Sequence, residues 1–403
     1  QNREHWLQRF YEIEKEAVRP RKNGELAAFE FIWETQPPTS DEKAKRLVEI
    51  LKRGGVEVRE QLQSGPYIRT RVLVPLAQPY GGFAKALLEL QHYPDLRDSS
   101  GQPIRPYDVT AHSLAQLMNV KVEPIYAPFR EFDTNGAIVP KPHANPYLST
   151  SVRFAVYKSH VPTFDEGWTR WILERQFSQP ARYSSLEDAE ARMGNLHAKY
   201  DAIVIPDQPR AAILNGHRKG TMPDEYTGGL GEDGVKALRE FVEAGGTLVC
   251  LNRASDFAIE QFKLPLKDVV DGLPRTDFYV PGSILQIELD TSNPIAAGMP
   301  KQSIAWVENS PVFEVIRDIV FTGSPKEEER FFPPHVHVIA RYPSDKDALL
   351  SGWLLGGDRI KGKAALVEVT IGKGRIILFG FRPQYRGQSL VTYPLFFNAI
   401  SSK

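Results

Sequence analysis

A chain of 403 residues is longer than most single domains, so we expect two or three domains. Because 50 basic residues balance 50 acidic ones, the composition gives no electrostatic basis for binding nucleic acid or an anionic membrane. There is no apolar run of about 18 residues, so no membrane-spanning helix is predicted. The single cysteine, Cys250, excludes an internal disulfide and a cysteine-rich metal site.

The first 130 residues predict a helix followed by a small α/β domain. Residues 2–19 place Trp6, Phe10, Ile13 and Ala17 at spacings of three and four, which is typical of an amphipathic helix. A strand, a helix and a second strand over residues 27–58 indicate a βαβ crossover. Further elements are expected as a strand at 71–76, helices at 82–90 and 108–118, and a strand at 120–125. We assign residues 1–22 to an N-terminal linker helix, 23–130 to the small α/β domain, and the proline-rich stretch 131–150 to a linker.

Residues 151–403 predict a larger α/β domain with a β-rich C-terminal extension. Buried apolar strands alternate with amphipathic helices, which indicates a doubly wound, flavodoxin-like parallel sheet covered on both faces. The strands are expected at 152–157, 201–205 and 247–251, and the helices at 165–177, 234–244 and 257–262. In the extension, strands are expected at 284–289, 336–341, 364–369 and 375–379, and a last helix at 393–400.

The turn after Leu251 is the only hydrolase-like feature of the sequence. In α/β hydrolases and amidotransferases, a sharp turn from a strand into a helix presents a serine or cysteine nucleophile. Here Asn252 takes that position, and a carboxamide cannot attack a carbonyl. Asn252, Arg253 and Ser255 are still candidates for ligand binding, because the carboxyl edge of such a sheet is the usual ligand position. We expect Ser255 to cap the following helix, and Arg170 is a further candidate for the same cleft.

The histidines do not form a known zinc motif, since none stands in an HExxH or HxxE arrangement. His335 and His337 alternate along one predicted strand and are therefore candidates for metal binding. The favoured interpretation is two histidines on an edge strand. We therefore expect no metal site, no cofactor and no catalytic residue in this chain.

Several stretches resemble the C-terminal part of large bacterial proteins of the zinc carboxypeptidase (carboxypeptidase A-like) family. In that resemblance, a zinc peptidase domain comes first and a class I glutamine-amidotransferase-like domain closes the chain. It implies a degenerate amidotransferase-like domain over roughly residues 151–262, a trailing peptidase helix at 1–20, and zinc only in the missing peptidase domain. The stretches are VPLAQP (74–79), QHYPDL (91–96), PYDVT (106–110), DEGWTR (165–170), YDAIVIPD (200–207), YTGGL (226–230), GFRPQYR (380–386) and FNA (397–399).

Three functions remain open from the sequence. The first is an accessory, non-catalytic region of a carboxypeptidase-like hydrolase, which positions the peptidase domain of the same precursor or binds substrate. The second is an independent hydrolase or small-ligand-binding domain that uses the cleft at Asn252. The third is an oligomerisation module acting through the β-rich tail. The family resemblance also implies an exported, extracytoplasmic protein of a bacterium, either periplasmic or secreted.

Overall fold

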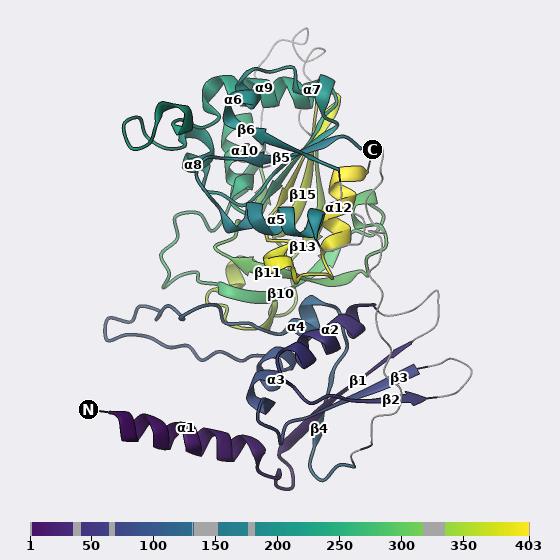
Figure 1. The fold of residues 1–403 in the computed structure, drawn as a ribbon. Helices are drawn as coiled ribbons and strands as arrows, with labels where there is room; N and C mark the ends of the chain where they lie inside the picture. The colour runs from purple at the N-terminus through teal and green to yellow at the C-terminus, as the bar shows by residue number, and fades with distance from the viewer. Residues whose placement is uncertain are drawn as a thin grey trace. The chain divides into compact units, whose positions relative to one another are not determined.

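A computed structural model shows the chain as two compact units (Figure 1). It describes residues 2–34, 42–63, 69–130, 132, 152–175, 182–316 and 335–402. The first unit comprises Gln1–His92 and Ala111–Pro142, and the second comprises Tyr93–Thr110 and His143–Lys403. Tyr93–Thr110, which we placed in the small domain from sequence, therefore packs with the second unit. Apart from Phe132, the predicted linker at 131–150 lies outside the described residues.

The first unit is a four-stranded sheet with neighbouring helices. The sheet order is β2-β3-β1-β4, and β3 runs antiparallel to both β1 and β2. The first and second strands therefore run in the same direction, but β3 lies between them, which corrects the simple βαβ crossover predicted from sequence. The elements are α1 (Arg3–Val18), β1 (Leu26–Glu34), α2 (Glu42–Arg53), β2 (Arg59–Gln63), β3 (Arg69–Pro75), α3 (Gly81–Leu88), α4 (Leu114–Leu117) and β4 (Glu123–Tyr126).

The helix predicted at 108–118 is shorter than expected. Only α4 forms, because the stretch before it is used in contacts within the second unit. The backbone N–H of Thr110 donates to the carbonyl of Gly282, and its hydroxyl contacts Gly282 and Ser283, both at 2.9 Å. Local sequence preference is overridden here by long-range hydrogen bonds.

The second unit contains a twelve-stranded mixed sheet among the described residues. No helix in this part or elsewhere in the described chain is long and apolar enough to cross a membrane. Its strands are β5 (Phe154–Lys158), β6 (Ser184–Glu187), β7 (Ala202–Ile205), β8 (Thr247–Leu251), β9 (Leu266–Asp268), β10 (Pro281–Leu289), β11 (Gln302–Glu308), β12 (Phe313–Val315), β13 (His335–Arg341), β14 (Leu349–Ser351), β15 (Ala364–Ile371) and β16 (Gly374–Phe379). Its helices are α5 (Phe164–Glu174), α6 (Asp188–Arg192), α7 (Leu196–Lys199), α8 (Arg210–Asn215), α9 (Gly231–Glu243), α10 (Ala254–Phe262) and α12 (Tyr393–Ser401), with 3₁₀ turns η1 (Asp224–Tyr226), η2 (Pro294–Ala296), η3 (Gly357–Arg359) and η4 (Tyr385–Gly387).

Five strands of this sheet are parallel, in the order β6-β5-β7-β8-β16. Counted in chain order, this is the 2-1-3-4-5 order of the flavodoxin-like doubly wound fold. The predicted α/β fold class is thus confirmed. The β-rich extension is not separate from it, because β15 pairs antiparallel with β16 and continues the same sheet through β13, β10 and β11.

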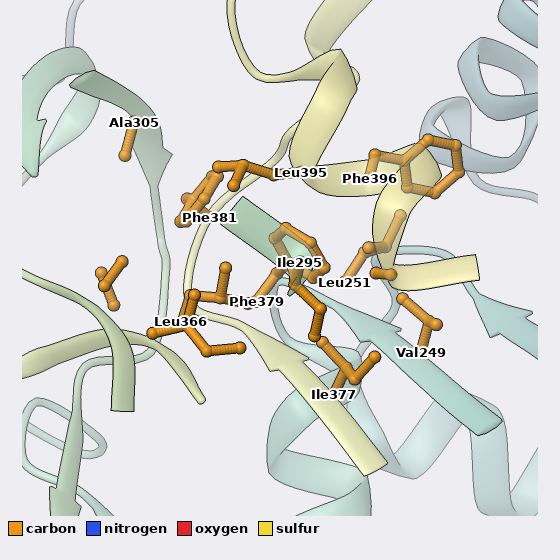
Figure 2. Close-up of a cluster of buried hydrophobic side chains, with 14 of the residues drawn as sticks. Val249, Leu251, Ile295, Ala305, Leu366, Ile377, Phe379, Phe381, Leu395 and Phe396 are labelled. Carbon is orange, nitrogen blue, oxygen red and sulfur yellow. The ribbon is translucent and has the colours of Figure 1, made fainter. Parts of the chain in front are cut away.

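Hydrophobic clusters cover both faces of the parallel strands. On one face Val249, Leu251, Ile377 and Phe379 pack against Phe396 of α12 and its neighbours (Figure 2). On the other face, alternate residues of the same strands pack against α9 and α10. This alternation explains why the strands read as continuous apolar runs.

Candidate functional site

Polar side chains gather where the parallel strands end. Asp207 follows β7, Asn252 and Arg253 follow β8, Arg382 follows β16, and Asp165 lies in the first turn of the helix after β5. We call these five residues the crest. The carboxyl ends of β5 and β7 also flank the point where the strand order reverses, which is the usual ligand position in this fold.

The carboxylate of Asp207 is the centre of the crest. Its Oδ1 accepts hydrogen bonds from the side-chain amide of Asn252 at 3.0 Å and from the backbone N–H of Arg253 at 3.0 Å. The Arg253 guanidinium adds a bidentate pair, with Nε at 2.9 Å from Oδ1 and Nη2 at 2.7 Å from Oδ2. Asp207 is only 1% exposed, and burying its charge costs free energy. The charge-assisted hydrogen bonds from these donors offset that cost.

Arg382 joins this centre to the other strand ends. Its Nη2 donates to Asp207 Oδ2 at 2.8 Å, and its Nε lies 3.2 Å from Asp165 Oδ1. A third group, Nη1, donates to the backbone carbonyl of Glu308 at 2.7 Å. The guanidinium is buried, and its N–H groups donate to acceptors inside the protein. Arg382 is therefore placed to hold the crest together.

Asn252 has the backbone of a nucleophile turn without the nucleophile. Its φ is +52°, in the left-handed region that asparagine tolerates better than most residues. The residue is fully buried, and its amide points to Asp207. The nearby thiol of Cys250 faces the core, and burial raises its pKa well above the ordinary value for a thiol. Neither group is a usable nucleophile.

The two crest carboxylates have opposite pKa shifts. Burial raises the pKa of Asp165 above its ordinary value, although the charges of Arg382 and Arg253 counteract part of the effect. Burial acts in the same direction on Asp207, but the hydrogen bond from Arg253 and the charge of Arg382 outweigh it and lower the pKa. The shifts separate the pKa values of the two groups, so Asp207 holds its negative charge more firmly than Asp165 does.

Two buried amide oxygens at the crest have no hydrogen-bond partner within the described part of the chain. One is Oδ1 of Asn252 and the other is Oε1 of Gln384. The Gln384 amide nitrogen donates to the hydroxyl of Thr169 at 3.2 Å, on the same helix as Asp165. A buried acceptor without a donor costs free energy, so these are the two positions where a bound donor would be favourable.

The other residues predicted from sequence lie in different settings. Ser255 does not cap α10: its hydroxyl is buried and donates to the backbone carbonyls of Cys250 at 3.3 Å and Phe379 at 3.0 Å. It ties β8 to β16 and is turned away from solvent. Arg170 forms an ion pair with Glu166 at 3.0 Å on the outside of α5.

The histidines of β13 do not gather further ligands. Nε2 of His337 bonds to Asp290 at 2.8 Å, and His335 is exposed at the start of the strand. Across the described ranges no group of three or more His, Cys, Asp or Glu residues is arranged to hold a metal ion.

Sequence reasoning missed Asp165, Asp207, Arg382 and Gln384. Each lies just beyond a parallel strand or at the start of the next helix, so position at a strand end was the usable signal. The final strand was assigned to the β-rich extension of this domain and not to its parallel sheet, and this hid the contribution of Arg382 and Gln384.

No known family model matches the sequence, and no match is found among curated proteins. Solved structures show distant likenesses. A ThuA-like protein from Bacteroides uniformis is 11% identical with a TM-score of 0.34, over 66% of this chain and 97% of its own. A GMP synthase component from Thermoplasma acidophilum is 10% identical with a TM-score of 0.32, over 62% of this chain and 94% of its own. A β-galactosidase from Bacillus circulans is 12% identical with a TM-score of 0.34, over 60% of this chain and 30% of the enzyme. At these scores the strand order, rather than the likenesses, defines the fold.

The chemistry available at the crest is limited by these contacts. Nucleophilic catalysis needs a nucleophile and a base within hydrogen-bond reach. Here a carboxamide stands at the turn, and the group that reaches the same carboxylate from β16 is a guanidinium, which does not accept protons. The crest of the described structure is suited to holding strand ends together and to presenting Arg253, whose side chain is 36% exposed.

Proposed function

We propose that this chain is an accessory, non-catalytic region of a carboxypeptidase-like zinc metallopeptidase. In this proposal it positions the peptidase domain of the same precursor or binds its substrate. Zinc would be held by the peptidase domain, and the protein would be exported by a bacterium. The support for this parentage is a set of sequence stretches that resemble that family, three of which supply crest residues: DEGWTR, YDAIVIPD and GFRPQYR.

The observation that carries the non-catalytic assignment is that the crest is closed, which means that its polar groups are bonded to one another and its nucleophile position is buried. The nucleophile position is fully buried and bonded to Asp207, and Arg382 uses its donors on Asp207, Asp165 and Glu308. A site prepared for hydrolysis keeps an open position for a substrate carbonyl and donors directed at the developing oxyanion. The crest donors are instead committed to internal carboxylates.

The test compares this chain with the longer precursor that the proposal requires. The isolated chain, incubated with zinc and peptides that differ in their C-terminal residue, should release no amino acid. The precursor should release the C-terminal residue, and a chelator should abolish that activity. Turnover by the isolated chain would contradict the proposal.

A second candidate function is supported by the two unpartnered oxygens. A small ligand with hydrogen-bond donors could satisfy Asn252 Oδ1 and Gln384 Oε1, and the partly exposed Arg253 would form the rim of its site. This function requires that the crest opens to solvent. The rate at which a thiol placed at position 252 reacts with a reagent in solution separates it from the first proposal.

A further inference from the structure

The N-terminal helix α1 exposes an apolar stripe without covering it. No residue of α1 is buried. Trp6 is 67% exposed, Phe10 63% and Ile13 55%, and with Ala17 they follow a spacing of 4, 3 and 4 residues. This alternation is the a/d pattern of a helix that pairs with another helix along one seam. An isolated helix of 16 residues is only marginally stable in water, so a partner on the seam would stabilise it.

The helix is nevertheless held firmly at its C-terminal end. Arg19 forms a bidentate pair with Glu25, at 2.7 and 3.0 Å, and Arg21 donates to the carbonyl of Leu76 at 2.7 Å. These contacts attach α1 to the first unit through residues that follow the stripe. Trp6, Phe10 and Ile13 take no part in these contacts and are left exposed, whereas Ala17, at the attached end, is partly covered and its carbonyl accepts from Arg21.

The charges of α1 favour a particular partner. Residues 3–10 carry two arginines against one glutamate, whereas residues 11–18 carry three glutamates against one lysine. Two copies of α1 placed antiparallel would bring each basic half beside an acidic half, and the helix dipoles would also oppose each other favourably. In that arrangement Phe10 packs on Ile13 of the second copy, and Arg9 lies beside its Glu16.

We propose that α1 is a self-association element, through which two copies of this chain pair by an antiparallel contact along Trp6, Phe10, Ile13 and Ala17. The contact does not depend on the crest, and in the proposed precursor it requires that the peptidase domain leaves this stripe uncovered. One helix face is smaller than a standard interface of about 20–30 residues a side. The expected dissociation constant is therefore on the order of micromolar.

Sedimentation of the whole chain between about 1 and about 100 μM, a range that brackets such a constant, tests the proposal. The mass should rise from that of the 45.4 kDa monomer towards the dimer as concentration increases. Phe10→Glu should weaken pairing at least tenfold. Tyr11→Glu is the matched control, because Tyr11 is also 63% exposed but lies outside the seam, and it should leave pairing unchanged. All these positions are on the surface, so the folded units are unaffected.

A charge exchange tests the antiparallel register. Arg9→Glu should weaken pairing by placing two glutamates together. Adding Glu16→Arg, which also removes the 2.6 Å ion pair of Glu16 with Arg19, should restore it. In a parallel pair Arg9 would lie beside Glu14, and the second substitution would give no rescue. A chain that stays monomeric over the whole range overturns the proposal, as does equal weakening by Phe10→Glu and Tyr11→Glu.

Discussion

Asn252 shows how a single residue determines the chemistry of the crest. The backbone there adopts a left-handed φ of +52°, as a turn that presents a nucleophile can do. The side chain, however, donates to Asp207 and does not react. The sequence alone identified a carboxamide at this turn, because residue type and position after an apolar strand were both visible.

What the sequence did not reveal at this scale was the ion-pair network. Asp207 and Arg382 are 175 residues apart, and no spacing rule connects them. Their pairing depends on β16 lying beside β8, which is a property of the folded sheet. The candidate site was therefore predictable at Asn252 and Arg253, and not at the residues that hold them.

We expect Arg382→Met to destabilise the second unit by about 3–5 kcal/mol at neutral pH, because it leaves two buried carboxylates without their shared cation. Asp207 has a lowered pKa in the folded state, so its stabilising contribution is present above its ordinary pKa and is lost as the pH falls through the folded value. The deficit of the variant should therefore shrink in acid. Urea unfolding at pH 7 and pH 3 measures both effects.

Arg170→Met is the control for this prediction. Its ion pair with Glu166 is partly exposed, so its loss should cost less than about 1 kcal/mol. Equal stability of Arg382→Met and the unchanged chain would show that the crest network is not structural.

At the scale of elements, buried apolar runs were the reliable signal. The strands β5, β7 and β8 were predicted because their residues are apolar and both faces of the sheet are covered. The edge strand β6, with sequence SSLE, was missed because it lacks such a run. The capping role expected of Ser255 was wrong, because α10 begins directly after the turn and the hydroxyl binds strand carbonyls.

The first turn of α10 carries a carboxylate in an unfavourable environment. Burial raises the pKa of Asp256 to about 8, and the charges of Asp268 and Asp271 add to the shift while Arg210 and Arg253 oppose it. The folded-state pKa lies above the unfolded value, so the proton-linked stabilisation is fully present below about pH 4 and is lost as pH rises through about 8.

We therefore expect Asp256→Asn to make the second unit more stable than the unchanged chain at pH 9, by a few kcal/mol at about 1.4 kcal/mol per pKa unit. Near pH 4 the two should be alike. Thermal unfolding across this range is the measurement. Glu260→Gln, on the exposed side of the same helix, should stay within about 0.5 kcal/mol at every pH. A parallel pH dependence of Asp256→Asn and the unchanged chain would contradict the assignment.

At the scale of the whole molecule, the chain order and the packing units do not coincide. Tyr93–Thr110 lies between elements of the first unit in sequence but is bonded to β10 of the second unit. Composition and periodicity gave two α/β domains correctly, because they depend on local patterns. The packing of Tyr93–Thr110 with the second unit depends on hydrogen bonds between Thr110 and residues more than a hundred positions away. No local pattern encodes such contacts.

The molecule thus has an exposed helix, α1, and a crest whose charged side chains pair with one another. The non-catalytic assignment, as argued from the crest, requires that the crest stays closed in solution. A ligand-binding or hydrolytic role requires that solvent and substrate reach the position of Asn252. Accessibility at that one position therefore decides between the two functions.

The most direct measurement is the rate at which a thiol-specific reagent labels an Asn252→Cys variant of the folded chain. Tyr107→Cys, at a fully exposed position, gives the rate of an open site, and the unchanged chain gives the background of buried Cys250. Labelling in urea confirms that both thiols are present in the variant. Our account predicts that Asn252→Cys reacts at least about 100-fold more slowly than Tyr107→Cys, since reaction must wait for local opening. A rate equal to or above that of Tyr107→Cys would contradict it.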